Sequence, residues 1–222
     1  MTISLAIAAA CLLVSYLLGS IPTGYLAGKW LQDIDIRQHG SGSTGATNVL
    51  RTLGKKAAIA VLLCDALKGI AGILFVKLLF AHPEWVTLPV EWRDWLIVGA
   101  AFGAVIGHSK SIFLGFEGGK SVATSIGVLL VMTPIVALGT LATFGVVIAL
   151  SQIVSLSSIA GAIAVMVLMI LLQKPLPYII FGVLASVYVI VRHRSNIERI
   201  LAGSEPKIGK KVNQSSSEKT TA

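Results

Sequence analysis

Three polar segments of the sequence contain residue types that could bind an anion. The first runs from Gly40 to Asn48, reads GSGSTGATN, and is followed by Arg51, Lys55 and Lys56. Glycines separated by small hydroxyl residues allow successive backbone N–H groups to turn toward an anion, which the cations downstream would neutralise. The segment therefore predicts a phosphate site, with a flexible solvated loop as the alternative.

The second segment, residues 115–124, reads GFEGGKSVAT and opens an apolar run. It is one residue too short for the P-loop pattern G-x-x-x-x-G-K-S, so a nucleotide hydrolase is not expected. Gly118, Gly119 and Lys120 would stand at a helix N-terminus, where unpaired N–H groups and the helix dipole favour a negative ligand. A second phosphate contact is one interpretation, and a lysine that anchors the protein at the membrane surface is the other.

The third segment, residues 192–199, reads RHRSNIER and follows the last apolar run. On a helix His193 and Asn196 would share a face and could hold a hydroxyl or a phosphate oxygen. Their spacing alone does not decide between that role and a structural one. The three arginines of the segment are interpreted as a cytoplasmic anchor cluster.

An ionisable pair, Asp65 and Lys68, lies inside an apolar run. Ionisable groups within a membrane span are costly and usually face the interior of the bundle. The pair could brace its helix against the glycine-serine loop or bind the substrate directly. His108, at the end of another apolar run, leaves the same two alternatives.

The composition excludes a soluble fold for the 222 residues. Hydrophobic residues make up 55% and charged residues 13%, and the mean hydropathy is +0.85; the charged share is about half that of a typical soluble domain. Seven apolar runs fill most of the chain, at about 3–28, 57–80, 95–107, 122–133, 135–150, 153–172 and 175–191. These runs predict an all-α polytopic membrane protein, a seven-helix bundle formed by residues 1–203, with a polar, disordered tail at 204–222.

Two further patterns describe the bundle. The third and fourth apolar runs are short for full spans, so half-length or re-entrant helices are expected there. Glycines recur every four residues at Gly99, Gly103 and Gly107, which favours close approach of helix backbones in lipid. Cys11 and Cys64 both lie within apolar runs, which indicates packing residues rather than a disulfide or a metal site.

The net charge of +8 is explained by membrane topology. Fourteen of the 18 Lys and Arg residues fall in one set of loops and the tail, whereas only Arg93 and Lys174 fall in the opposite loops. The positive-inside rule then places the N-terminus outside and the C-terminus in the cytoplasm. The cations form no single basic face with interleaved aromatic residues, so nucleic acid is not an expected partner.

Together these segments, with GS at 19–20, DALKG at 65–69 and GHS at 107–109, resemble the bacterial acyl-phosphate-dependent glycerol-3-phosphate acyltransferase family over residues 10 to about 203. The resemblance implies a multi-pass inner-membrane enzyme with its active site toward the cytoplasm. It would transfer a fatty acyl group from a long-chain acyl phosphate to position 1 of glycerol 3-phosphate, giving lysophosphatidate and phosphate and starting phospholipid synthesis. Apart from these substrates and membrane lipid, no cofactor, metal or obligate protein partner is implied.

The resemblance also implies roles for individual residues. Ser41 would hydrogen-bond in the active site, Asn48 would support its loop, Arg51 would bind the phosphate of glycerol 3-phosphate, and Gly118 and Gly119 would offer backbone donors beside Lys120. The implied catalytic residues are Ser41, His193 and Asn196. The implied substrate-binding residues are Gly40, Gly42, Asn48, Arg51, Gly118, Gly119 and Lys120, and the supporting residues are Asp65, Lys68 and His108.

The sequence departs from the family pattern at Ser43, Ser111, Glu117 and Ser195. Glu117 replaces a lysine near a site for two phosphate-bearing substrates, so we expect it to point away and Lys120 to bind alone. An acyl phosphate carries a good leaving group, so no covalent nucleophile is required. Either His193 or the phosphate oxygens of the donor could take the proton from the acceptor hydroxyl, and we favour the phosphate oxygens.

A transporter or flippase of a phosphorylated metabolite is the main alternative function. Such a protein should show repeat symmetry and polar groups near the middle of the membrane. Here the polar segments gather on the cytoplasmic side, which favours chemistry at that interface. Acyl-CoA or acyl carrier protein as the donor is a third possibility that the sequence does not exclude.

Overall fold

The structure is a computed structural model that describes residues 2–208. Within these residues the chain forms α-helices and short 3-10 helices, with one isolated bridge between Ser111 and Glu117. The α-helices are α1 (Thr2–Ser20), α2 (Thr23–Gln32), α3 (Ala46–Thr52), α4 (Lys55–Ala81), α5 (Arg93–Ser109), α6 (Val122–Met132), α7 (Pro134–Ser151), α8 (Val154–Leu171), α9 (Leu176–Arg192) and α10 (Arg194–Leu201). The 3-10 helices are η1 (Ile36–Gln38), η2 (Val90–Trp92) and η3 (Ile112–Leu114). The expected all-helical class is confirmed.

Six of the seven apolar runs correspond to single helices, but the first run is broken. It was expected as one helix over residues 3–28, whereas α1 ends at Ser20 and α2 begins at Thr23. Pro22 explains the break, because proline has no N–H to continue the helical hydrogen bonds. The ammonium of Lys68 donates a hydrogen bond to the Ile21 carbonyl oxygen, 2.9 Å away, and so satisfies an acceptor that the break exposes.

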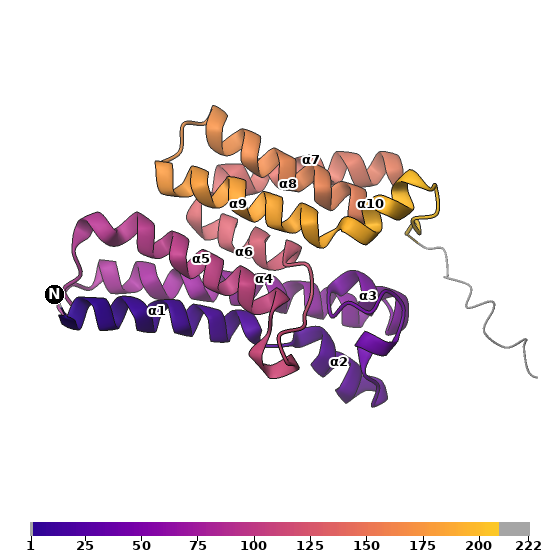
Figure 1. Cartoon of the computed structure of the whole chain (residues 1–222), viewed down its shortest axis with the longest axis horizontal. Helices are drawn as coiled ribbons and strands as arrows, with labels where there is room; N and C mark the ends of the chain where they lie inside the picture. The colour runs from indigo at the N-terminus through magenta and orange to yellow at the C-terminus, as the bar shows by residue number, and fades with distance from the viewer. Residues whose placement is uncertain (1, 209–222) are drawn as a thin grey trace, which may run out of the picture.

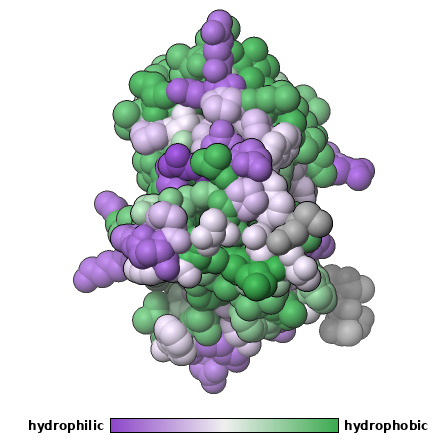
Figure 2. Space-filling view, turned by 90° about the vertical axis from the view of Figure 1, so that its left-hand side faces the viewer, coloured by the Kyte–Doolittle hydropathy of each residue, from purple (hydrophilic) through white to green (hydrophobic). Residues whose placement is uncertain are grey.

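Several helices are long and apolar enough to cross a membrane. By length and composition these are Thr2–Gln32, α4, α7 and α8, and the pair α9 and α10, bent by 60°, would make a fifth. Large apolar side chains are exposed on them, for example Leu63 and Leu67 on α4 and Leu138 on α7. Figure 2 looks onto the end of the bundle that carries the N-terminus, where hydrophilic patches lie among hydrophobic residues.

The helices pack in two groups with α6 between them (Figure 1). Helix α1 packs against α4 and α5, α4 packs against α6, and α8 packs against α7 and α9. A Cβ atom on Gly107 would lie 2.3 Å from the carbonyl oxygen of Tyr16, so the close approach of α5 to α1 requires this glycine. The predicted glycine stripe therefore has the packing role expected of it. Helices α2, α3 and α10 lie at the end of the bundle opposite the N-terminus.

The chain continues to pack beyond the expected end of the membrane domain at residue 203. Glu205 is buried, and the N–H of Ile208 donates to the Gln152 carbonyl oxygen at 2.9 Å. The chain therefore contacts the bundle up to at least five residues beyond the expected boundary at 203, because the acidic side chain of Glu205 has partners inside it. The rest of the expected tail, residues 209–222, lies outside the described residues.

Candidate active site

A cavity of about 400 Å³ opens at the end of the bundle that carries α3 and α10. It brings together eight of the expected site residues: Ser41, Asn48, Arg51, Asp65, His108, Lys120, His193 and Asn196. The expected residues that do not line it are Gly40, Gly42, Lys68, Gly118 and Gly119. Side chains from all three polar segments of the sequence thus meet at one cavity.

The glycine-serine loop is organised around the buried amide of Asn48. Its Oδ1 accepts the N–H of Ser41 at 2.8 Å, and its Nδ2 donates to the carbonyl oxygens of Ile36, His39 and Ser43 at 3.1, 2.9 and 2.8 Å. The loop backbone thus occupies both polar atoms of this amide. Asn48 therefore shapes the loop, while Ser41 and Arg51, on α3, line the cavity beside it.

Two glycines of this loop allow its backbone to turn tightly. Gly40 and Gly42 have φ angles of +60° and +69°, in a region of backbone conformation that residues with a Cβ atom rarely adopt. A Cβ on Gly40 would also lie 2.2 Å from Oδ1 of Asn48. Both glycines were expected as substrate ligands, whereas their place in the structure indicates that they let the chain fold tightly around Asn48.

The second segment lies against His108, at the end of α5. The N–H of Gly119 donates to the His108 carbonyl oxygen at 3.2 Å, so it is not offered to a ligand in this structure. Cβ atoms on Gly118 and Gly119 would lie 2.2 Å from the carbonyl oxygen of His108 and 2.1 Å from its Nε2. The expected donor role of Gly119 is therefore wrong here, because α5 already uses this N–H and the glycines are needed for close packing.

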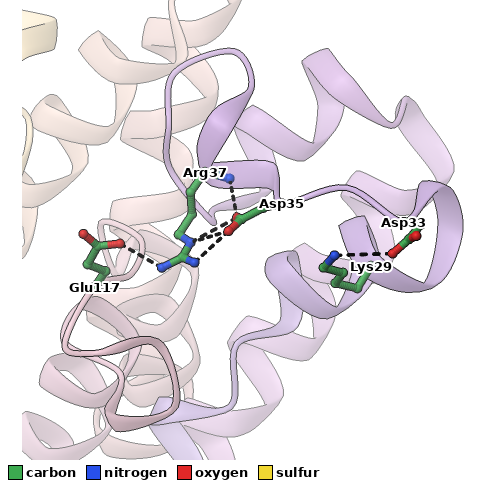
Figure 3. A network of polar contacts seen from close by, with 5 residues as sticks. All are labelled: Lys29, Asp33, Asp35, Arg37 and Glu117. Atoms are coloured by element: carbon green, nitrogen blue, oxygen red, sulfur yellow. Dashed lines mark hydrogen bonds and ion pairs between the residues drawn. The ribbon is translucent and has the colours of Figure 1, made fainter.

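Glu117 points away from the cavity, as expected. Its Oε2 lies 2.9 Å from Nη1 of Arg37, which also binds Asp35 at 2.7 Å (Figure 3). The side chain of Glu117 is 66% exposed. The hydrogen-bonded carboxylate of Asp35 raises the pKa of Arg37, so this guanidinium stays charged. The pair links the loop around the first segment to the loop around the second.

Lys120 and Asn196 are in direct contact in the cavity, where the ammonium of Lys120 donates to Oδ1 of Asn196. Nδ2 of Asn196 donates to Oε1 of Glu205 at 2.6 Å, and Oγ of Ser155 donates to the same oxygen at 2.8 Å. Nε of Arg199 donates to the other oxygen, Oε2, at 2.7 Å. The carboxylate of Glu205, whose side chain is 2% exposed, thus fixes the orientation of Asn196.

Sequence reasoning missed Glu205, because it lies in the stretch that was interpreted as a disordered tail. The available signal was weak: one acidic residue directly before a proline, close to the His193 and Asn196 segment. Burial alone would raise the pKa of Glu205, but the hydrogen bonds from Asn196, Ser155 and Arg199 lower it. Glu205 is therefore a buried carboxylate close to the cations of the pocket.

The electrostatics of the pocket weaken two bases. Burial of the ammonium, followed by the charge of Arg199, lowers the pKa of Lys120 to about 8. Burial also lowers the pKa of His193, which follows the last residue of α9, to about 4. Nδ1 of His193 lies 2.8 Å from the carbonyl oxygen of Val189, so a neutral imidazole that donates there presents Nε2 as an acceptor.

Asp65 and Lys68 form a buried ion pair of 2.9 Å. Oδ1 of Asp65 also accepts from Oγ1 of Thr23 at 2.5 Å and lies 3.4 Å from Nδ1 of His108, while Lys68 donates to the Ile21 carbonyl oxygen. The pair thus braces α4 against the break between α1 and α2. These contacts favour the bracing interpretation for Lys68, while Asp65 and His108 also line the cavity.

The arginines of the third segment differ from one another. Arg194 is 86% exposed and pairs with Glu198, as an anchor residue would. Arg199 binds Glu205, and Arg192 donates to the carbonyl oxygens of Gly118 and Gly119. The anchor interpretation is therefore wrong for Arg192 and Arg199, because both guanidinium groups bind other parts of the protein.

The remainder of the cavity is lined mainly by apolar side chains, with the hydroxyl groups of Ser125 and Thr140 among them. It is lined by side chains from α4, α6, α7, α8 and α9, among them Leu62, Leu63, Leu129, Leu141, Phe144, Val165 and Phe181. Ser158 and Ser186 also line it, but their hydroxyl groups donate to the carbonyl oxygens of Val154 and Ala162. The site thus combines a cationic, hydrogen-bonding end with an apolar body.

Comparison with known proteins identifies the family. The family described as glycerol-3-phosphate acyltransferase matches residues 9–203. The chain belongs to this family. A glycerol-3-phosphate acyltransferase from Crocosphaera subtropica is 59% identical over 211 residues, which cover 95% of this chain and 98% of that protein.

A second member, from Synechococcus elongatus, is 52% identical over 90% of this chain and 94% of its own length. The fold is similar to the crystal structure of PlsY (YgiH), described as an integral membrane glycerol 3-phosphate acyltransferase, in its glycerol 3-phosphate form. The TM-score is 0.81 at 33% identity, and the match covers 91% of this chain and 96% of that one. The lysophosphatidic acid form of the same protein gives a TM-score of 0.78. The acyltransferase resemblance of the sequence is thereby confirmed.

Proposed function

We propose that this membrane acyltransferase moves a fatty acyl group from an acyl phosphate to the position 1 hydroxyl of glycerol 3-phosphate, giving lysophosphatidate and phosphate. One observation carries the proposal: a single cavity joins a cationic end, with Lys120 and Arg51, to an apolar body formed by five helices. The cationic end suits the two phosphate groups of the substrates. The apolar body suits the acyl chain.

The chemistry of the cationic end supports acyl phosphate as the donor. Acyl phosphate and glycerol 3-phosphate each bring one phosphate, and the two cations reach the cavity from different elements, Arg51 from α3 and Lys120 from the loop before α6. We assign Lys120 to the phosphate of the donor and Arg51 to the phosphate of glycerol 3-phosphate, with Ser41 as a hydrogen-bond donor between them. Each cation would then neutralise one anion and hold the two substrates in reacting distance.

The reaction needs no covalent intermediate on the protein. The position 1 oxygen attacks the acyl carbonyl carbon, the bond from this carbon to the phosphate oxygen breaks, and phosphate leaves with the bonding electrons. Lys120 stabilises the charge that develops on the departing phosphate. Cys11 is buried in α1, in keeping with a packing role, whereas Cys64 is exposed on α4; neither cysteine lines the cavity.

The proton of the acceptor hydroxyl is proposed to move to a phosphate oxygen of the donor. A pKa of about 4 makes His193 a weak base, which argues against general base catalysis by this residue. Its Nε2 can still accept the hydroxyl hydrogen bond and aim the oxygen at the carbonyl carbon. Asn196, held by Glu205, would orient Lys120 and the acceptor beside it.

The proposal also includes how the helices cross the membrane. We propose that the chain crosses the membrane seven times. Helices α1 and α2 together form the first crossing. Helix α6, with 11 residues and a length of about 16 Å, forms a half-length crossing. The cavity lies at the end of the bundle that carries most of the basic residues, whereas Arg93 and Lys174 flank the opposite end. This distribution supports an active site and a C-terminus in the cytoplasm, an N-terminus outside, and placement in the inner membrane. The membrane domain would extend to about residue 208.

The proposal is tested by phosphate release from purified protein in detergent, with acyl phosphate and glycerol 3-phosphate. Lys120→Met should lose nearly all turnover, and Lys110→Met should retain it, because Lys110 is exposed and lies outside the cavity. Saturable glycerol 3-phosphate binding without turnover would contradict the proposal and favour a transporter.

A further inference from the structure

Arg192, the last residue of α9, turns its guanidinium into the protein. Its Nη2 lies 3.1 Å from the carbonyl oxygen of Gly119 and 3.3 Å from that of Gly118. Its Nε is buried and has no hydrogen-bond partner within residues 2–208. The guanidinium of Arg192 thus binds the backbone of the second segment directly before Lys120.

The second segment is held from two sides at this point. On one side the N–H of Gly119 donates to the His108 carbonyl oxygen, which fixes the segment to α5. On the other side Arg192 binds the carbonyl oxygens of Gly118 and Gly119, which fixes it to α9. The peptide planes on both sides of Gly119 are thereby set, and these planes determine where the backbone of Lys120 begins.

We propose that Arg192 is a positioning residue, which holds the Gly118 and Gly119 carbonyl groups so that the Lys120 ammonium reaches Asn196 and the substrate phosphate. The inference rests on the proposed function, in which Lys120 binds the donor phosphate. The residue two positions further on makes a useful contrast. Arg194 is 86% exposed and, within residues 2–208, its side chain hydrogen-bonds to Glu198 and not to the second segment.

Arg192 also acts on Lys120 through its charge. The charged and titratable groups around Lys120 come from several elements: Arg51 on α3, Asp65 on α4, His108 on α5, His193 after α9, Arg199 on α10, and Glu205. Burial and Arg199 lower the pKa of Lys120 most, and Arg192 and Arg51 lower it further, while Glu205 raises it. Removal of the Arg192 charge should therefore raise the pKa of Lys120, which a purely structural role would not do.

The test compares the Arg192→Gln, Arg192→Lys and Arg194→Gln variants in the full-length protein. Arg192→Gln should lower kcat/KM for acyl phosphate by on the order of 100-fold, the cost of a misplaced catalytic group. Arg192→Lys retains the cation without the planar guanidinium, so it should recover part of the loss. Arg194→Gln should stay within about twofold of the wild type, because its surface ion pair is weak.

The second readout does not depend on turnover. An amine-specific label, applied across a pH series and read at Lys120 by mass spectrometry, gives the pKa of this lysine directly. In Arg192→Gln the labelling curve should move to higher pH, and in Arg194→Gln it should coincide with the wild type. Failure of the wild type to turn over acyl phosphate would overturn the proposed function. The positioning role would be overturned by an Arg192→Gln variant with wild-type kcat/KM, or by one whose Lys120 labelling curve does not move.

Discussion

Raising the pH above 8 should lower kcat/KM by removing the proton from Lys120. Burial of this ammonium in the cavity, together with the charge of Arg199, lowers its pKa to about 8, whereas a lysine in water titrates near 10.4. The charged form is the one that binds a phosphate. Because the pKa is lowered, the charge is present below pH 8 and is lost as the pH rises through this value.

The size of the effect follows from the titration of one group. With a pKa of about 8, roughly 90% of Lys120 is charged at pH 7 and roughly 10% at pH 9. The value of kcat/KM should therefore fall about tenfold between these two pH values, since kcat/KM reports the free enzyme. Phosphate monoesters lose their second proton near pH 6, so glycerol 3-phosphate should not titrate in this window.

The assay measures phosphate release between pH 6 and pH 10, with the spontaneous hydrolysis of acyl phosphate subtracted at each pH. Lys120→Arg is the matched variant, because a guanidinium stays charged throughout this range. Whatever activity that variant retains should show no fall near pH 8. A wild-type kcat/KM that stays flat to pH 10, or a fall that survives in Lys120→Arg, would refute the assignment of the titrating group.

Two further predictions concern the framework of the site and its apolar body. Glu205→Ala should lower both activity and the unfolding temperature, because it removes a buried carboxylate with three partners and so lowers the free energy of unfolding by about 3–5 kcal/mol. The control Glu198→Ala, at an exposed surface pair, should change neither. Equal unfolding temperatures for the two variants would contradict the structural role of Glu205. Gly161→Leu should reduce the rate with long acyl chains more than with short ones, because Gly161 lines the cavity and a larger side chain would fill it. Gly145→Leu, at an exposed helical position outside the cavity, is its control, and an unchanged chain-length profile in Gly161→Leu would show that the acyl chain lies elsewhere.

The helical architecture and the composition of the site could be predicted because their signals are local. Each apolar run is long enough to specify a helix without knowledge of its neighbours. Three polar segments in a hydrophobic chain are expected to gather at a shared pocket. The outward direction of Glu117 could be inferred in the same way, since a carboxylate beside two phosphate groups would be repelled. Pro22 is present in the sequence, but it lies between apolar residues, so the run was interpreted as one helix and the break between α1 and α2 was not predicted.

The roles that could not be predicted depend on partners distant in the sequence. Gly119 was expected to present its N–H to a ligand, and only the packing of α5 shows that His108 uses it. Arg192 has the same sequence signal as Arg194, a cation after an apolar run, yet one is turned inward and the other outward. Glu205 becomes a site residue only through Asn196, Ser155 and Arg199, none of which its own surroundings in the sequence indicate.

In the proposed reaction acyl phosphate is the donor, and acyl transfer occurs without an enzyme-bound intermediate. The measurement that tests it most directly is the stoichiometry of products from purified protein given glycerol 3-phosphate and a long-chain acyl phosphate, with acyl-CoA in a parallel reaction. We predict one phosphate released for each lysophosphatidate formed, and no product from acyl-CoA. Turnover with acyl-CoA alone, or phosphate release that does not require glycerol 3-phosphate, would contradict the account.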